Sequence, residues 1–145
     1  MKILNDRRGY SLTFWTGFFG IILVPIMALS IELGRYFYAR AEVAKAADAA
    51  ALAAAAEISQ RVFEETGDLQ PTSKTWANAQ AFASMNNNYL GQYGVNAVVT
   101  GINVDVGKDT VLVQVSANID RLFPSIVPNV LVTETGQAQI RAFTR

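Results

Sequence analysis

Three oxygen-bearing side chains lie close to one glycine in the C-terminal half of the chain. Asn103, Asp105 and Asp109 surround Gly107, and carboxylate and amide oxygens are the ligands that Ca²⁺ prefers. A hand-type calcium loop would have its glycine at the sixth position and a bidentate glutamate at the twelfth, and this segment has neither. We therefore expect a solvated hairpin tip here and no metal site.

The serine hydroxyls lack the partners that nucleophilic catalysis requires. The sequence contains no histidine and no cysteine, so imidazole bases, thiolates and the usual zinc, haem and iron–sulfur ligands are absent. No serine lies in a Gly-x-Ser-x-Gly or Ser-x-x-Lys motif, and there is no phosphate loop or dinucleotide fingerprint. We predict that the protein is not an enzyme, with no catalytic, cofactor-binding or metal-binding residues.

The charges of the chain cancel. Twelve basic and twelve acidic residues give a formal net charge of zero, and no basic run is longer than Arg7-Arg8. Nucleic-acid binding depends on clustered positive charge. We expect no nucleic-acid partner.

Near the N-terminus, residues 10–31 contain no charged residue. At about 1.5 Å per residue, a helix of this length crosses a hydrocarbon core of roughly 30 Å. Strong helix formers follow, with no glycine between Gly34 and Gly67 and no further proline until Pro71. We predict a transmembrane helix over 10–31 and its extramembrane continuation over 32–66, with the helix ending near Val62.

Positive charge precedes the span, as Arg7 and Arg8, which favours a cytoplasmic location for residues 1–9 and an exported C-terminal side. Arg35, Arg40 and Lys45 follow the span and weaken this asymmetry. Glu32 and Arg35, three residues apart, are expected at the outer membrane boundary as a salt bridge or a headgroup contact.

Three processing outcomes are open: an uncleaved anchor, signal cleavage near Ser30, and leader cleavage after Gly9. The first explains most, because the helical pattern resumes beyond Ser30. The short leader that ends at Gly9 resembles that of type IV prepilins, although Phe14 stands where those carry a glutamate.

Small residues suggest where other helices could pack. Gly17 and Gly20 would allow close approach within the span. The tract Ala49–Ala56 has small apolar side chains on every helical face, so we prefer contact with a partner helix over a solvated stalk. The expected contact residues are Ala47, Ala51, Leu52 and Ala54.

Several N-terminal motifs together resemble one family. They are Asp6-Arg7-Arg8-Gly9, the apolar span, Glu32-Leu33-Gly34-Arg35-Tyr36, and Ala46-Ala47-Asp48-Ala49-Ala50-Ala51-Leu52-Ala53. They resemble the N-terminal region of TadE/TadG-like proteins of tight-adherence (Flp) pilus systems. The resemblance covers about the first third of the chain. It implies a bitopic, pilin-like protein of the bacterial inner membrane whose outer domain helps to build or anchor a surface filament, and it implies no catalytic residues.

Residues 68–145 predict a small exported α+β domain. Ser73 is the expected cap of a second helix over 74–90, with Trp76, Ala79, Gln80, Ala83 and Met85 recurring at near-helical spacing. Alternating patterns predict strands at 95–106, 111–119 and 130–143, with Ile102, Val104 and Val106 on one face of the first, and a hairpin loop at Gly107–Asp109. The fold class is α+β, with a three-stranded antiparallel sheet and a type IV pilin-like plan.

The proline-bounded segment 121–128 carries large apolar residues that cannot lie in a regular central strand. Phe123 and Ile126 either fold back over the sheet as core, which we favour, or contact another subunit.

The leading functional hypothesis is a structural or assembly component, similar to a minor pilin or pseudopilin, of a tight-adherence-type surface pilus. It would act by helix packing, with membrane lipid and other pilus or pilin-like subunits, including copies of itself, as partners. One alternative is the major subunit of an extracellular filament, with residues 10–31 as the fibre core. Another is a membrane-tethered ligand-binding module.

Overall fold

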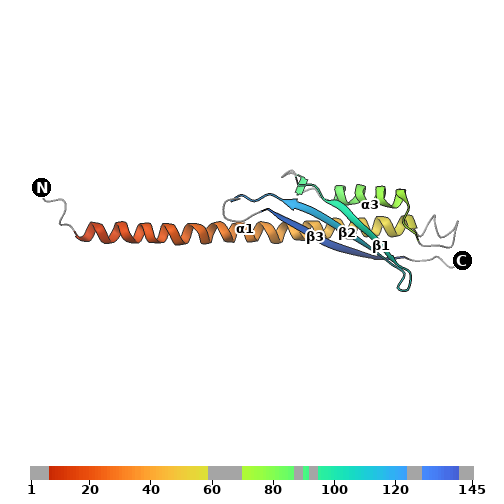
Figure 1. Cartoon of the computed structure of the whole chain (residues 1–145), viewed down its shortest axis with the longest axis horizontal. Helices are drawn as coiled ribbons and strands as arrows, with labels where there is room; N and C mark the ends of the chain where they lie inside the picture. Colours follow the sequence, from red (N-terminus) through yellow and green to blue (C-terminus); the bar gives the residue numbers. More distant parts are fainter. Residues whose placement is uncertain (1–6, 59–69, 87–89, 92–94, 124–128, 141–145) are drawn as a thin grey trace. The chain divides into compact units, whose positions relative to one another are not determined.

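A computed structural model describes residues 7–58, 70–86, 90–91, 95–123 and 129–140. Within these described residues, helices precede strands (Figure 1), in the order α1 (Arg7–Glu57), α3 (Ser73–Met85), β1 (Val98–Asp105), β2 (Thr110–Ile119) and β3 (Val130–Gln139). The predicted α+β class, with its long apolar N-terminal helix, second helix and three-stranded antiparallel sheet, is confirmed.

The chain divides into two compact units. The N-terminal unit is Met1–Arg35, and its described part is helical. The C-terminal unit is Tyr36–Arg145 and contains the remainder of α1, α3 and the sheet. The alanine tract thus packs as part of the same unit as the strands.

Helix α1 continues through Pro25. Its hydroxyl side chains bond to the helix itself: Thr16 Oγ1 donates to the carbonyl of Leu12 at 2.9 Å, and Ser30 Oγ donates to that of Ile26 at 2.8 Å. Such bonds satisfy the hydroxyl groups within the helix itself. The predicted end near Val62 lies outside the described residues.

Helix α3 begins one residue away from the expected cap, because Thr72, and not Ser73, is the N-cap. Thr72 Oγ1 accepts from the backbone N–H of Thr75 at 3.3 Å, and Thr75 Oγ1 accepts from that of Thr72 at 3.1 Å. This reciprocal pair satisfies two of the free donors at the helix start. The helix ends at Met85, with Asn86 as C-cap, and residues 87–89 lie outside the described residues.

The helical spacing on α3 identified its buried face only in part. Ala79 and Ala83 are fully buried, whereas Trp76 is 40% and Met85 64% exposed. Of the residues that recur at helical spacing on α3, the small alanines are therefore the ones that pack in the closely packed core.

The sheet has the order β1-β2-β3, and both pairs are antiparallel. Strand β2 is central, and its alternation is as predicted: Val111, Val113, Val115, Ala117 and Ile119 are all buried. Its neighbours along the strand, such as Gln114, lie on the outer face. Because this strand pairs on both sides, it supplies most of the sheet's buried side chains.

The outer strands are shorter than expected. Strand β1 ends at Asp105, so Val106 lies in the turn, 63% exposed, and its predicted place on the inner face is wrong. Strand β3 ends at Gln139, followed by buried Ile140, and residues 141–145 lie outside the described residues. The β1–β2 pairing is irregular between Val99 and Gly101.

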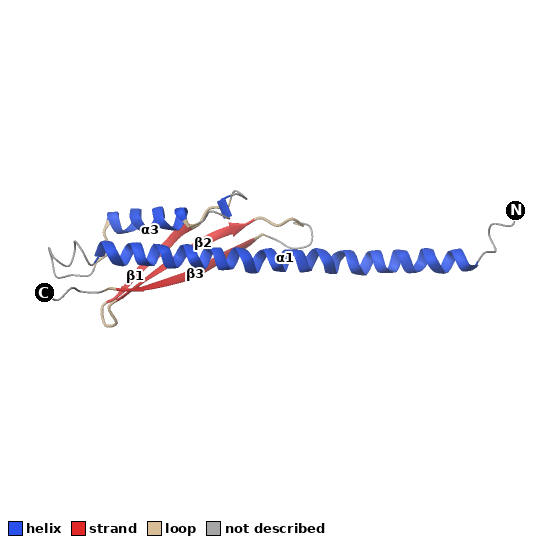
Figure 2. Ribbon diagram, turned by 180° about the vertical axis from the view of Figure 1, so that it is seen from behind, coloured by secondary structure: helices blue, strands red, loops and turns tan. Residues whose placement is uncertain are grey.

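The core of the C-terminal unit lies between the sheet and the helices. Figure 2 shows α1 crossing one face of the sheet in this unit. Alanines of α1 and α3 face valines of β2 in one cluster of buried residues. Small side chains on the helices let the backbones approach the sheet closely.

Candidate functional site

The alanine tract is mostly buried within the chain. Ala47, Ala51 and Ala54 are fully buried in the core of the C-terminal unit, whereas Leu52 is 67% exposed. These three alanines therefore pack in the core with the sheet of their own chain, and Leu52 lies on the face of α1 that remains exposed. The exposed residues of α1 in this region recur at helical spacing: Ala41, Lys45, Asp48, Leu52 and Ala56. We call these five residues the exposed stripe.

Gly136 of β3 explains how close α1 comes to the sheet. A Cβ atom built on Gly136 would overlap the backbone carbonyl of Ala47 and would lie 2.5 Å from the amide nitrogen of Asp48. A side chain there would collide with backbone and not with a flexible side chain. Sequence reasoning missed this residue, although an isolated glycine within a strand pattern indicates close backbone approach.

Gln80 is a second residue whose role was missed. Its Nε2 donates to the carbonyl of Ala97 at 3.0 Å, and its Oε1 accepts from the backbone N–H of Val99 at 2.8 Å. The side-chain amide thus pairs with the open edge of the sheet, much as a neighbouring strand would. A glutamine on a helix gives no signal of this in the sequence.

One ion pair joins α1 to the sheet, and another lies within α1. Arg40 Nε donates to Glu134 Oε1 of β3 at 2.5 Å, and this hydrogen bond and the charge of Glu134 raise the pKa of Arg40. Lys45 Nζ donates to Glu42 Oε1 at 2.6 Å, and the same two causes raise the pKa of Lys45. The first pair ties the helix to the sheet, and the second supports one helical turn.

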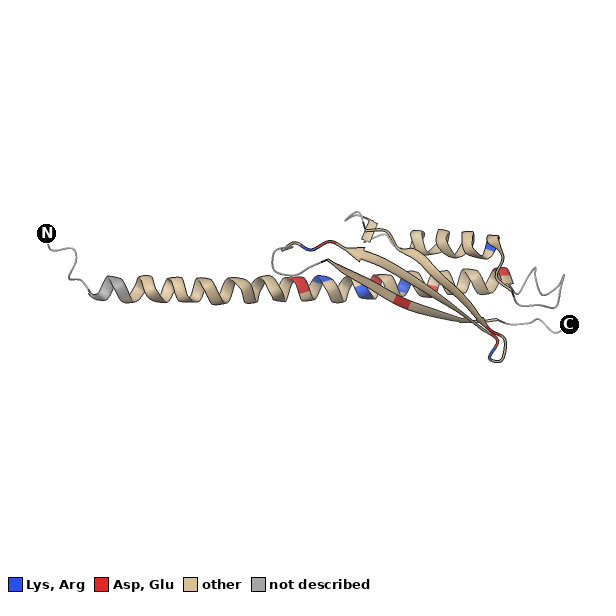
Figure 3. Cartoon of the chain, viewed as in Figure 1, with Lys and Arg blue, Asp and Glu red and all other residues tan. Residues whose placement is uncertain are grey.

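The N-terminal unit shows where charge begins on α1. Figure 3 shows an uncharged helical stretch followed by charged residues in the middle of the helix. Glu32 is 2% exposed and lies 3.8 Å from Arg35, measured from Oε2 to Nη1. Arg7 and Arg8 lie in the first turn of α1 and Gly9 follows them; their side chains are outside the described part.

The uncharged stretch is exposed along most of its length. Phe14, Trp15, Phe18 and Phe19 form ring contacts along the helix, with centroids 5.7 to 6.3 Å apart. A Cβ atom on Gly17 or on Gly20 would meet nothing within 4 Å. Both glycines therefore leave open surface on this helix.

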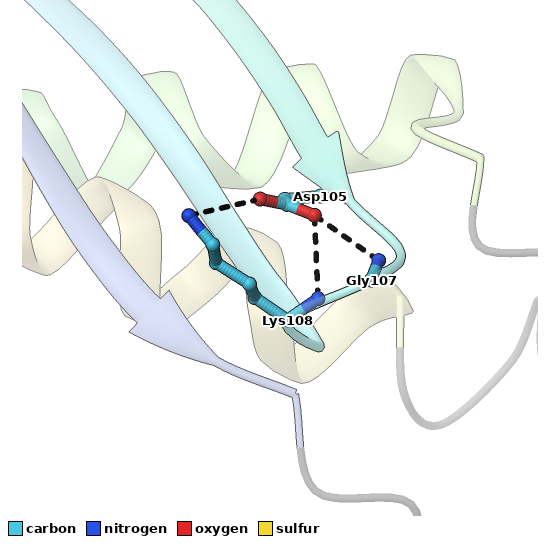
Figure 4. A network of polar contacts seen from close by, with 3 residues as sticks. All are labelled: Asp105, Gly107 and Lys108. Atoms are coloured by element: carbon cyan, nitrogen blue, oxygen red, sulfur yellow. Dashed lines mark hydrogen bonds and ion pairs between the residues drawn. The ribbon is translucent and has the colours of Figure 1, made fainter.

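The polar contacts at the hairpin tip are those of a turn and not those of a calcium site (Figure 4). Asp105 Oδ1 accepts from the backbone N–H groups of Gly107 at 3.0 Å and Lys108 at 3.2 Å, and its Oδ2 lies 3.7 Å from Lys108 Nζ. Both carboxylate oxygens thus serve the turn itself. Asp109 adopts a positive φ of 51°, which short polar residues tolerate. No group of three metal-type ligands occurs among the described residues.

The start of the β2–β3 connection contacts α1. Arg121 Cζ lies 5.8 Å from the ring centroid of Tyr36. Phe123 is 37% exposed and lies outside the buried core, so the core interpretation that we favoured for it is wrong. Ile126 lies outside the described residues.

The comparisons with known proteins concern α1. Residues 9–57 match the model of the family Tad, TadE/G-like Flp pilus assembly. No curated protein and no solved structure matches the chain. Among the described residues, one helix is long and apolar enough to cross a membrane, judged by length and composition. Together, the helix and the match suggest a membrane-anchored protein that takes part in pilus assembly. The segment 9–57 is therefore similar to TadE/G-like proteins of Flp pilus assembly.

Proposed function

We propose that this protein is a minor pilin-like or pseudopilin-like component of a tight-adherence-type surface pilus and that it acts by helix packing. The observation that carries the proposal is the family match over 9–57. This segment is almost the whole of α1, so the resemblance lies in the element that would pack against other subunits. The role is structural and requires no catalytic group.

The proposed placement is a single-pass protein of the bacterial inner membrane. Residues 1–9 would be cytoplasmic, residues 10–31 would span the bilayer, and residues 36–145 would lie outside the cytoplasm. The exposed apolar side chains of α1 and the bonding of its hydroxyls within the helix support this placement. Glu32 and Arg35 would then mark the outer boundary.

The proposed packing surfaces are Gly17 and Gly20 within the span and the exposed stripe outside it. Leu52 is the large apolar member of that stripe, and its exposure of 67% makes it available to a neighbouring helix. Ala47, Ala51 and Ala54 would serve assembly indirectly, because they hold the sheet against α1. The partners would be other pilus or pilin-like subunits, including further copies of this chain.

In-cell crosslinking tests these surfaces. The chain has no cysteine, so Leu52→Cys and Gly20→Cys introduce single reactive thiols without a background. We expect both to capture another protein in cells that build the pilus. Ala51→Cys is the matched control for Leu52→Cys, because Ala51 is adjacent but fully buried. Absence of capture at both exposed positions would contradict helix packing as the mode of action.

A second candidate is the major subunit of a filament whose fibre core is made of residues 10–31. The ring contacts among Phe14, Trp15, Phe18 and Phe19 favour it, because stacked exposed aromatics could pack between neighbouring helices. Mass spectrometry of the mature N-terminus separates the possibilities. Met1 indicates an uncleaved anchor, Tyr10 a processed pilin and Ile31 a secreted protein. Phe123 and Ile126 remain a proposed subunit contact in either case.

A further inference from the structure

The β2–β3 connection begins with one basic and two exposed apolar residues. Arg121, Leu122 and Phe123 follow one another directly, and Leu122 is 57% and Phe123 37% exposed. Adjacent exposed side chains of this size are uncommon on a solvated surface unless they bind something. The question is what they bind.

Contact with α1 fixes the level of this connection in the C-terminal unit. Arg121 Cζ lies 5.8 Å from the ring centroid of Tyr36, within the range of a cation–π interaction. Tyr36 is the first residue of the unit and packs against its core. The connection therefore lies beside the first turn of α1 in this unit, at the end of the sheet opposite the β1–β2 hairpin (Figure 1).

The first turn of α1 in this unit has the composition of a membrane interface. Phe37 is 61% and Tyr38 47% exposed, directly after Tyr36. Aromatic residues and arginines are enriched where membrane meets water, because their apolar bodies and polar ends suit the headgroup layer. We call Phe37, Tyr38, Arg121, Leu122 and Phe123 the interfacial belt.

The proposed span places this belt at headgroup depth, and the inference rests on that part of the proposed function. Tyr36 follows Ile31 by five residues, which is about 8 Å along a helix. The headgroup layer on each side of a bilayer is roughly 5 to 8 Å thick. A side chain that lies beside Tyr36 is thus in the outer part of the headgroup layer.

We propose that the start of the β2–β3 connection is a second membrane contact, which binds the phospholipid leaflet on the outer side. Leu122 and Phe123 insert among the lipid headgroups, and Arg121 places a positive charge at the level of the phosphates. The sheet is then held to the bilayer at two points, α1 and this connection. A second contact away from the axis of α1 would restrict tilting of the C-terminal unit against the bilayer.

Fluorescence quenching of the full chain in vesicles tests the proposal. Leu122→Cys carries an environment-sensitive fluorophore, and the vesicles contain phosphatidylcholine, phosphatidylglycerol and a lipid with a nitroxide near the top of its acyl chain. The matched control is Val106→Cys, since Val106 is 63% exposed but lies at the β1–β2 turn. Strand β2 separates the two sites by about 33 Å. Ile22→Cys, in the middle of the proposed span, reports insertion itself.

We expect the probe at Leu122 to be quenched about twofold more than the probe at Val106, because an interfacial side chain lies close to the top of the acyl chains, where the nitroxide is placed. Equal quenching at Leu122 and Val106, with strong quenching at Ile22, would overturn this inference and leave the proposed span intact. Weak quenching at Ile22 would overturn both. Protection of Leu122 from aqueous iodide without lipid quenching would show a protein contact instead, and would also overturn the lipid assignment.

Discussion

Gly136 of β3 lies against the backbone of Ala47 of α1, with no space for a side chain between them. This contact sets the separation of helix and sheet in the C-terminal unit. Although β3 is an edge strand, this position tolerates a side chain as poorly as a core position does. The atoms that a side chain would meet belong to the helix backbone, which cannot rotate away.

Substitution of Gly136 by alanine should therefore destabilise the unit. The new Cβ must push α1 away from β3, and overpacking of this kind costs about 1 to 3 kcal/mol in the free energy of unfolding. Urea denaturation of the detergent-solubilised chain, followed by circular dichroism of the sheet, measures the change. Gly101→Ala is the control, since its Cβ would lie 3.6 Å from Gln114 Oε1, an ordinary contact. Equal losses for the two variants would contradict the close approach.

Substitutions at the adjacent residues Ala51 and Leu52 should change the free energy of unfolding to very different extents. Ala51 is fully buried, so Ala51→Leu should lower the free energy of unfolding by about 1 to 3 kcal/mol. Leu52→Ala removes an exposed side chain and should change it by less than about 0.5 kcal/mol. Thermal unfolding of both variants checks the order. A larger loss for Leu52→Ala would mean that the stripe, and not the buried alanines, packs within the chain.

Loss of the Gln80 side-chain amide should weaken the edge of β1. Gln80→Leu leaves the buried N–H of Val99 without its acceptor, which costs about 1 to 3 kcal/mol. Hydrogen exchange should show faster exchange at the amide of Val99, and denaturation should show the loss of stability. Gln137→Leu, on the exposed face of β3, should change neither. Unchanged exchange at Val99 in Gln80→Leu would show that water replaces the glutamine.

Alkaline pH should remove the contribution of the Glu42–Lys45 pair. The pKa of Lys45 is raised in the folded chain, so the stabilisation is complete below the ordinary lysine pKa and is lost as the pH rises through the raised value. The difference in melting temperature between the natural chain and Glu42→Gln should therefore vanish by about pH 12. The corresponding difference for Glu134→Gln should persist there, because Arg40 starts from a higher pKa, which is also raised. Loss of both differences together would indicate general unfolding.

The strands could be predicted from their local period, and the apolar helix from the length of its uncharged segment. Val111, Val113 and Val115 alternate with polar residues, and the sheet buries that face as expected. The hairpin loop after Asp105 was likewise evident from glycine and charge. The cap of α3 was misplaced by one residue because Thr72 and Ser73 both carry a hydroxyl, and only Thr72 can pair with Thr75.

Contacts between distant segments could not be predicted in this way. A tract of alanines indicates close packing but does not say against what, and Ala47 and Ala51 pack within their own chain. Gln80 and Gly136 act on segments that are distant in sequence, so no local pattern reveals them. The proposed packing surfaces of α1 and the interfacial belt remain predictions, because their partners are other molecules.

The small side chains of the helical interface have a further, entropic consequence. The buried residues that α1 and α3 contribute to the core are nearly all alanines, with Val43 as the larger exception. Alanine has no rotamers to lose, so ordering this interface costs almost no side-chain entropy. Each alanine contact contributes little free energy, but it also costs little side-chain entropy. Such an interface has few alternative side-chain packings. It should also accept substitution mainly among alanine, glycine and serine, because a longer side chain would overpack the interface.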